Sequence, residues 1–346
     1  MNLQKRIEFY YIKLIILQAI TKILITFLLI VTANVLKAQD IHFSQYFNSP
    51  LSLNPAQTGN FDGNWRIVGN TRDQWRALNY PYTTSLASFD RQLFMNRRHF
   101  AVGGLLMHDR SGDALLNTNE ICLSGAYHRT INNHNLSVGL QVGYVMKTID
   151  QFSLPEDYNP ASGQFEPKPN ASEHLSYLDV NVGVGWRRKI NKYEPEAGLA
   201  FFHINHPKES FFDDRSSKTP IRSVLYGSVK TELASDLYVK PGFMLYALRG
   251  SRDAMVGSQA GFSMAGNRFN VQDIYGGLYF RATSPSDALM AMLGIKVRNI
   301  EVNISYDINV SPLRAYTNNR GAFEISFIYK SISTIIKTFT IPCERI

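Results

Sequence analysis

The feature that most constrains this chain is a strict alternation of apolar and polar side chains over long segments. The clearest one runs from Leu136 to Thr148, and similar alternation covers residues 178–187 and 301–310. Successive side chains of a β-strand point to opposite faces, so each segment predicts a strand with one apolar and one polar face. We therefore expect a protein built from β-strands.

The length of these strands distinguishes a membrane protein from a soluble one. Alternation alone also fits a soluble sandwich, in which the apolar face is the core. A tilted strand needs about 9–11 residues to cross hydrocarbon, whereas strands of globular proteins centre on about 5–6. The long segments favour spanning. A mean hydropathy of −0.16 is too low for a protein with many membrane helices, which leaves spanning by strands.

The number and spacing of the strands predict a closed ring. About 14 candidates lie between residues 64 and 330, and an even number suits an antiparallel barrel. Closure is needed because lipid offers no partners to an unpaired strand edge. Short turns such as Asn132-Asn133 and Arg298-Asn299 alternate with long connections such as residues 150–176. We thus predict an all-β transmembrane antiparallel barrel with short periplasmic turns, long extracellular loops and both termini periplasmic.

Aromatic residues near the strand ends are candidates for the two interfacial girdles of such a barrel. Ordinary core packing is the alternative for them. These residues are Trp65, Trp75, Tyr80, Tyr82, Tyr127, Trp186, Tyr238, Tyr246 and Tyr279.

The start of the chain has the order of a secretory signal peptide. Basic residues up to Lys22 precede an apolar run from Ile23 to Ala33, and the small residue Ala38 follows. The run is about half of the roughly 20 residues that a spanning helix needs, so an uncleaved anchor is disfavoured. We expect cleavage near Ala38 and a final location in the cell outer membrane. The predicted division is a signal peptide (1–38), an N-terminal periplasmic segment (39–63), the barrel (64–330) and a C-terminal periplasmic tail (331–346).

Motifs that carry chemistry are largely missing from the sequence. There is no HExxH and no GxSxG, and Cys122 and Cys343 have neither CxxC nor His-linked spacing. The formal charge of +8 comes from scattered Lys and Arg without a nucleic-acid recognition motif. We predict no enzyme activity, no catalytic residues, no cofactor, no metal and no nucleic-acid partner.

The residues after the signal peptide resemble a known family. Residues 39–46 (QDIHFSQY), 48–51 (NSPL) and 53–56 (LNPA) are similar to the opening of the PorP/SprF family, outer-membrane proteins associated with the type IX secretion system of Bacteroidetes. The block Arg72-Asp73-Gln74-Trp75, followed by Ser88-Phe89-Asp90, resembles the next strand of that family and its returning partner.

The resemblance implies a non-catalytic barrel that assists secretion, translocation or surface anchoring of a large partner protein. In that family the partner is often an adhesin used in gliding motility, and the barrel helps its C-terminal domain to reach or stay on the cell surface. The implied partners are this secreted protein, the type IX secretion machinery and outer-membrane lipid. The rival hypothesis is a passive pore for small solutes, motivated by polar inward positions such as Gln141, Asn181 and Asn303.

Five residues of the family motifs are candidates for binding the partner: Asn54, Pro55, Arg72, Gln74 and Trp75. On the functional interpretation they shape a periplasmic mouth or an inner wall that receives the cargo domain. On the structural interpretation Asn54-Pro55 makes a turn before the first strand, while Arg72 and Gln74 satisfy polar partners in the lumen. We favour the structural interpretation because inward charge needs partners in any packed barrel.

Overall fold

The structure is a computed structural model. It describes residues 43–74, 81–95, 98–111, 116–149, 158–159, 164–165, 174–211, 214, 216–249, 251–264, 270–282, 287–311 and 320–332. The predicted signal peptide and the predicted C-terminal tail from residue 333 onward lie outside these ranges.

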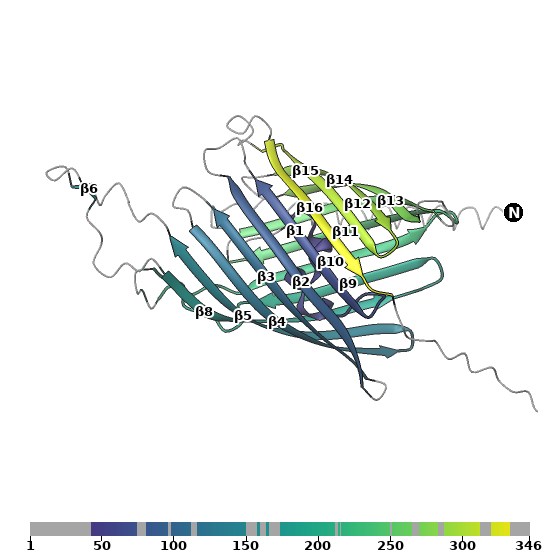
Figure 1. Cartoon of the computed structure of the whole chain (residues 1–346), viewed down its shortest axis with the longest axis horizontal. Helices are drawn as coiled ribbons and strands as arrows, with labels where there is room; N and C mark the ends of the chain where they lie inside the picture. Colours follow the sequence, from purple (N-terminus) through teal and green to yellow (C-terminus); the bar gives the residue numbers. More distant parts are fainter. Residues whose placement is uncertain are drawn as a thin grey trace, which may run out of the picture.

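Fourteen antiparallel strands of the described chain close into one barrel (Figure 1). The ring closes where β1 pairs with β16, from Arg66 opposite Lys330 to Gln74 opposite Ala322. The predicted transmembrane barrel of about fourteen strands is confirmed. The barrel strands are β1 (Trp65–Gln74), β2 (Tyr82–Met95), β3 (Arg98–Ser111), β4 (Leu116–Ile131), β5 (His134–Ile149), β8 (His174–Arg188), β9 (Tyr193–Phe202), β10 (Arg222–Glu232), β11 (Leu237–Leu248), β12 (Ser251–Ser263), β13 (Val271–Ala282), β14 (Ala288–Val297), β15 (Ile300–Asn309) and β16 (Arg320–Lys330). A small hairpin of β6 (Tyr158–Asn159) and β7 (Gln164–Phe165) lies between β5 and β8.

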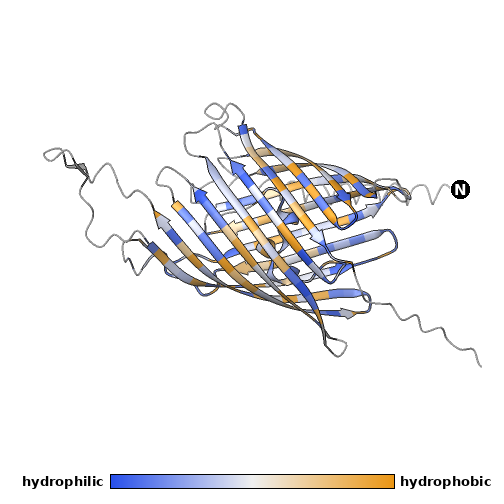
Figure 2. Cartoon of the chain, in the orientation of Figure 1, coloured by the Kyte–Doolittle hydropathy of each residue, from blue (hydrophilic) through white to orange (hydrophobic). Residues whose placement is uncertain are grey.

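The alternation in the sequence becomes the two faces of the barrel wall. Along β5, Leu136, Val138 and Leu140 are exposed on the outside, while Ser137 and Gln141 are buried on the inside. Figure 2 shows hydrophobic and hydrophilic residues alternating along the strands in this way. The outer face is therefore apolar and suited to lipid. The hydrogen bonds between neighbouring strands of the closed ring pair the backbone N–H and C=O groups.

Tight turns gather at one end of the barrel, which we call the tight-turn end. They join β4 to β5, β8 to β9, β10 to β11 and β14 to β15. Asn132 and Asn133 have positive φ values of 49° and 65°, as the central residues of a two-residue hairpin turn of type I′ do. The chain enters β1 and leaves β16 at this same end, and the opposite end is called the loop end.

The N-terminal part of the described chain lies inside the barrel. This luminal segment, residues 43–61, contains three short helices, η1 (Tyr46–Asn48), α2 (Pro50–Leu53) and η2 (Pro55–Gln57). It begins in the loop half of the lumen, since Ser44 bonds to Glu324 and Asp307, and it reaches the tight-turn end before β1. Among the described residues, no helix is long and apolar enough to span a membrane.

The luminal position differs from the prediction of a separate periplasmic segment over residues 39–63. The physical reason is that strands with polar inward faces enclose a space whose side chains need hydrogen-bond partners. The side chains and backbone amides of the luminal segment supply many of them.

The girdle prediction is wrong for three of the tyrosines. These residues, Tyr238, Tyr246 and Tyr279, point inward and are buried in an apolar cluster in the lumen. This is the alternative of core packing. By contrast, Trp65 stacks on Tyr329 with their ring centroids 5.0 Å apart. Two further girdle candidates, residues 75 and 80, lie outside the described residues.

Replacing Leu140 with Arg should destabilise the folded barrel strongly, because Leu140 lies midway along the outward apolar face of β5. A cation at the bilayer midplane costs about 2–4 kcal/mol, whereas one near the interface costs about 0–1 kcal/mol. Leu136→Arg, near the tight-turn end of the same face, is the matched control. Equilibrium unfolding of both variants in lipid bilayers measures the difference, and equal losses would contradict the assigned outer face.

Candidate functional site

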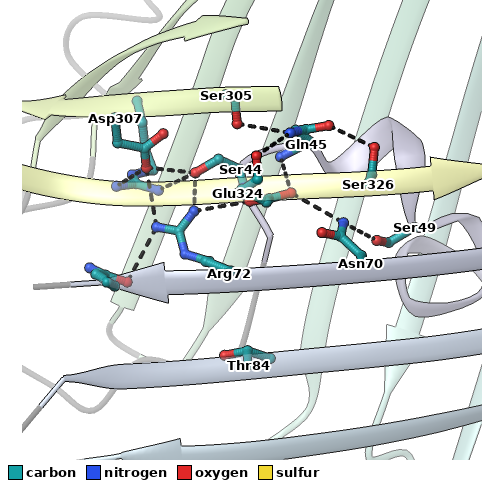
Figure 3. A network of polar contacts seen from close by, with 12 residues as sticks. Ser44, Gln45, Ser49, Asn70, Arg72, Thr84, Ser305, Asp307, Glu324 and Ser326 are labelled. Carbon is teal, nitrogen blue, oxygen red and sulfur yellow. Dashed lines mark hydrogen bonds and ion pairs between the residues drawn. The ribbon is translucent and has the colours of Figure 1, made fainter. Parts of the chain in front are cut away.

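The start of the luminal segment is held by one buried carboxylate, that of Glu324 on β16. Its oxygens accept hydrogen bonds from the backbone amides of Ser44 at 2.8 Å and Gln45 at 3.0 Å. The side-chain amide of Asn70 on β1 donates to the same carboxylate at 3.1 Å. Figure 3 shows these groups converging between β1, β16 and the segment. The barrel wall thus grips the backbone of the segment as well as its side chains.

Two arginines balance the charge of this network. Arg72 lies 3.2 Å from Glu324 and 3.1 Å from Asp307 (Figure 3). Arg281 lies 3.1 Å from Asp307. Arg72 also donates to the side-chain oxygen of Gln74 at 3.2 Å. A buried charge is costly unless it is paired and hydrogen-bonded, and here two cations meet two anions. The network therefore forms a neutral buried unit between β1, β13, β15 and β16.

The middle of the luminal segment rests on the opposite wall. The side-chain oxygen of Asn54 accepts a hydrogen bond from the amide of Ala56 at 2.8 Å and so caps η2. Its side-chain amide donates to the carbonyl of Val184 on β8 at 2.9 Å.

Glycines in the wall make room for this approach. A Cβ atom on Gly139 of β5 would lie 2.2 Å from the carbonyl carbon of Pro55, and one on Gly183 of β8 would lie 1.9 Å from the side-chain oxygen of Asn54. No side chain fits at such distances, so these two positions let the segment lie directly against the backbone of the strands.

A third anchor fixes the end of the segment near the tight-turn end. The buried carboxylate of Asp90 on β2 accepts a hydrogen bond from the amide of Gly59 at 2.7 Å. Arg66 binds the same carboxylate through two nitrogens, at 2.9 Å and 2.7 Å, and donates to the carbonyl of Gln57 at 3.1 Å. Gly59 has a φ of +71°, and a Cβ there would lie 2.3 Å from that of Ala101, so both the turn and the contact require glycine.

Apolar side chains of the segment complete its packing. Tyr46 and Leu53 join a buried cluster with tyrosines and methionines of β10 to β14, and Leu51 joins a second cluster with Val68 of β1. Burial, followed by the neighbouring hydroxyl of Tyr279, raises the pKa of Tyr46 well above its usual range, so its phenol stays neutral. The segment therefore occupies the lumen with a packed apolar interior.

The predicted site residues divide into two places. Arg72 and Gln74 lie together on β1 at the Glu324 network, while Asn54 and Pro55 lie at the contact with β5 and β8. Position 75, the fifth candidate, is outside the described residues. Asn54 and Pro55 belong to the luminal segment, Arg72 donates to the hydroxyl of Ser44 at its start, and Gln74 accepts a hydrogen bond from Arg72.

Sequence reasoning missed the partners that hold these residues. They are Arg66, Asp90, Arg281, Asp307 and Glu324, each at a buried position on an otherwise alternating strand. A charged residue on the inward face of a strand was the available signal, but it does not say which charges meet across the ring.

The polar inward residues that motivated the pore hypothesis bond within the chain. Gln141 donates to the carbonyl of Leu51 at 3.2 Å, and Asn181 donates to Gln141 at 3.0 Å. Asn303 accepts a hydrogen bond from the hydroxyl of Tyr275. Within the described chain, no three His, Cys, Asp or Glu side chains are placed to hold a metal ion.

A closed barrel with an apolar outer face and an occupied interior defines an integral β-barrel membrane protein. The model of the family described as type IX secretion system membrane protein PorP/SprF matches residues 35–329. The chain belongs to this family, as its sequence motifs had indicated, and is an outer-membrane barrel associated with type IX secretion.

Other comparisons find distant likenesses. Among solved structures, the chain is similar to the CymD monoaromatic hydrocarbon channel, at 10% identity over 82% of this chain and 93% of that chain with a TM-score of 0.49. It is also similar to a Pseudomonas aeruginosa FadL homologue, at 11% identity over 82% and 94% with a TM-score of 0.49. A third is CdiB from Acinetobacter baumannii, at 8% identity over 77% and 60% with a TM-score of 0.46. No curated protein matches the chain.

Replacing Arg72 with Met should destabilise the protein by about 3–5 kcal/mol, because it leaves Glu324 buried without its cation. Unfolding in guanidinium, followed by intrinsic fluorescence in detergent micelles, measures the loss. In the double variant Arg72→Met with Glu324→Gln, part of that loss should be recovered, since the unpaired charge is gone. Simple additivity of the two single losses would argue against the coupled network.

Replacing Gly139 with Ala should loosen the luminal segment, because the added Cβ overlaps the backbone at Pro55. Amide hydrogen exchange over residues 50–58 should become faster, as measured by mass spectrometry. Gly69→Ala is the matched control, since a Cβ at that position meets nothing within 4 Å. Unchanged exchange in the Gly139 variant would show that the segment does not rest on β5.

Proposed function

We propose that this protein is a non-catalytic docking element of the type IX secretion system. It assists the secretion or surface anchoring of a large cell-surface partner, of the adhesin type used in gliding motility, by engaging the partner's C-terminal domain. The observation that supports this proposal most strongly is that the luminal segment is anchored at three places, at Glu324, at Gly139 and Gly183, and at Asp90. A lumen occupied in this way favours docking of the partner over its passage through this barrel.

The alternative, a passive pore for small solutes, has less support. The inward polar residues that would line such a pore bond to each other, to the luminal segment or to neighbouring strands. Steady single-channel conductance of the purified protein in a planar bilayer would favour the pore over the docking element.

The proposal includes an orientation. The tight-turn end faces the periplasm and the loop end faces the cell exterior, as short turns and long loops do in outer-membrane barrels. The strand series then begins and ends on the periplasmic side, where the tail of residues 331–346 also lies. A signal peptide directs export of the chain and is removed by cleavage near Ala38.

The four described candidate residues act on the partner indirectly in this proposal. Arg72 and Gln74 keep the start of the luminal segment against β1 and β16, and Asn54 and Pro55 keep its middle against β5 and β8. Together they hold the luminal segment in place, and so they fix the shape of the lumen that the partner would meet at an end of the barrel.

A disulfide that locks the luminal segment tests docking against passage. The hydroxyls of Thr58 and Ser124 are in contact, so Thr58→Cys with Ser124→Cys places two thiols close enough to bridge. The background carries Cys122→Ala and Cys343→Ala, to remove the native thiols. We expect the locked protein to support surface display of the partner as well as the reduced protein does, as measured by immunolabelling of intact cells.

Deletion of the chain is the companion experiment. It should abolish display of one large partner while leaving outer-membrane integrity unchanged. Loss of display on locking alone would mean that the partner passes through the lumen, and normal display in the deletion strain would overturn the proposed function.

A further inference from the structure

A cavity lies between the luminal segment and the barrel wall at the tight-turn end. Its volume is about 260 Å³, and its lining includes Phe47 and Tyr279 as well as several charged side chains. Five of these are cations, each from a different strand: Arg66 of β1, Arg187 of β8, Lys240 of β11, Lys296 of β14 and Lys330 of β16. Only two carboxylates, those of Asp62 and Glu196, line the same space. The lining therefore has more cations than carboxylates, and each of the five cations also has an acidic partner within 4.0 Å.

Three of the cations hold their own acidic partners loosely. The nitrogen of Lys330 lies 3.4 Å from Glu301, and that of Lys296 lies 4.0 Å from Asp273. Arg187 lies 3.8 Å from Asp62, whose side chain is 99% exposed. Good hydrogen bonds between nitrogen and oxygen are about 2.7–3.2 Å long, so these cations can turn to an incoming anion at little cost.

The same three cations are reached by water from the tight-turn end. Their side chains are 33–35% exposed, although they point into the ring. Arg66 is the direct partner of Lys330 in the β1–β16 register, and Lys296 lies on β14, two strands from Lys330, so like charges gather on one wall. An anion entering from this end would relieve that repulsion. Lipid outside the ring has no path to the cavity through the paired strands.

The spacing of the cations fits a chain of carboxylates better than one compact anion. Neighbouring strands lie about 4.8 Å apart, so Lys330 and Lys296, two strands apart, are offset by roughly 10 Å along the wall. Same-side residues of an extended peptide recur about every 6.6–6.8 Å, which is shorter than the distance between the two backbone positions, so the long lysine side chains lean toward each other to meet two such carboxylates. The aromatic rings of Phe47 and Tyr279, whose centroids lie 5.5 Å apart, add an apolar surface for the peptide's other face.

We propose that this basic cavity binds an extended acidic peptide segment that enters from the tight-turn end. The proposal deepens the docking function, since it rests on that function for the source of the peptide, a segment of the secreted partner. The cavity then contributes electrostatic recognition, while the luminal segment forms its floor.

Binding of a defined probe to the full mature chain in non-ionic detergent tests the cavity. The probe is a rhodamine-labelled octapeptide of alternating glutamate and serine, read by fluorescence anisotropy. Lys296→Gln with Lys330→Gln should weaken its binding roughly tenfold, and added salt should weaken it further. The matched control is Lys208→Gln with Lys218→Gln, which makes the same charge change at exposed positions between β9 and β10 and should leave binding unchanged.

The outcomes separate the cavity from the docking function. The same peptide with glutamine in place of glutamate should not bind, and inorganic phosphate should compete only weakly. Equal binding by both double variants, or phosphate competing as well as the peptide, would overturn the acidic-peptide site. If that happens while deletion still abolishes partner display, the cavity proposal fails and the docking function stands. If the probe binds to the cavity but the deletion strain still displays the partner normally, the cavity proposal stands and the docking function fails.

Discussion

The carboxylate of Glu324 is the interaction on which the arrangement of the interior depends. It sits on β16, the strand that closes the ring against β1, and it receives two backbone amides from the luminal segment. Closure of the ring brings Glu324 opposite Arg72 in the β1–β16 register. The same pairing that removes the last free strand edge therefore also completes the buried network. The pairing of β1 with β16 therefore does two things: it leaves no unpaired strand edge in the lipid, and it completes the packing of the interior.

Charges at the other anchor follow the same logic. Asp90 and Arg66 are neighbours in the β1–β2 register, and their ion pair is already formed by two consecutive strands. The pair then forms hydrogen bonds with the backbone of Gly59 and Gln57 in the luminal segment. Local strand pairing therefore prepares the exit anchor, whereas the Glu324 anchor needs the whole ring. This difference predicts that the segment's exit is organised before its start during folding, because contacts close in sequence have a lower entropic cost.

Much of the fold could be predicted from the sequence because the signal is local. Period-two alternation in segments such as Leu136 to Thr148 sets the faces and lengths of the strands. This local signal is enough to predict a closed barrel of about fourteen strands. The luminal segment could not be placed in the same way. Residues 43–61 have no long period, and their partners, such as Glu324, lie some 280 residues away. The inward tyrosines were misplaced for a related reason: an aromatic residue near a strand end suits a girdle or a packed interior equally well until the filling of the lumen is known.

The position of the luminal segment also explains why one end of the barrel keeps an accessible basic cavity. The segment leans on β5 and β8 through Gly139 and Gly183, and on β1 and β16 through the Glu324 network. Between these walls its polar groups pair with the strands, and what remains at the tight-turn end is lined by Lys296, Lys330 and other long side chains that can extend toward water. A segment anchored at three points thus leaves these long cationic side chains free of direct contact with its anchors along that part of the described wall. Groups of that kind suit recognition of a charged partner better than conduction, because they respond to a ligand without any movement of the ring.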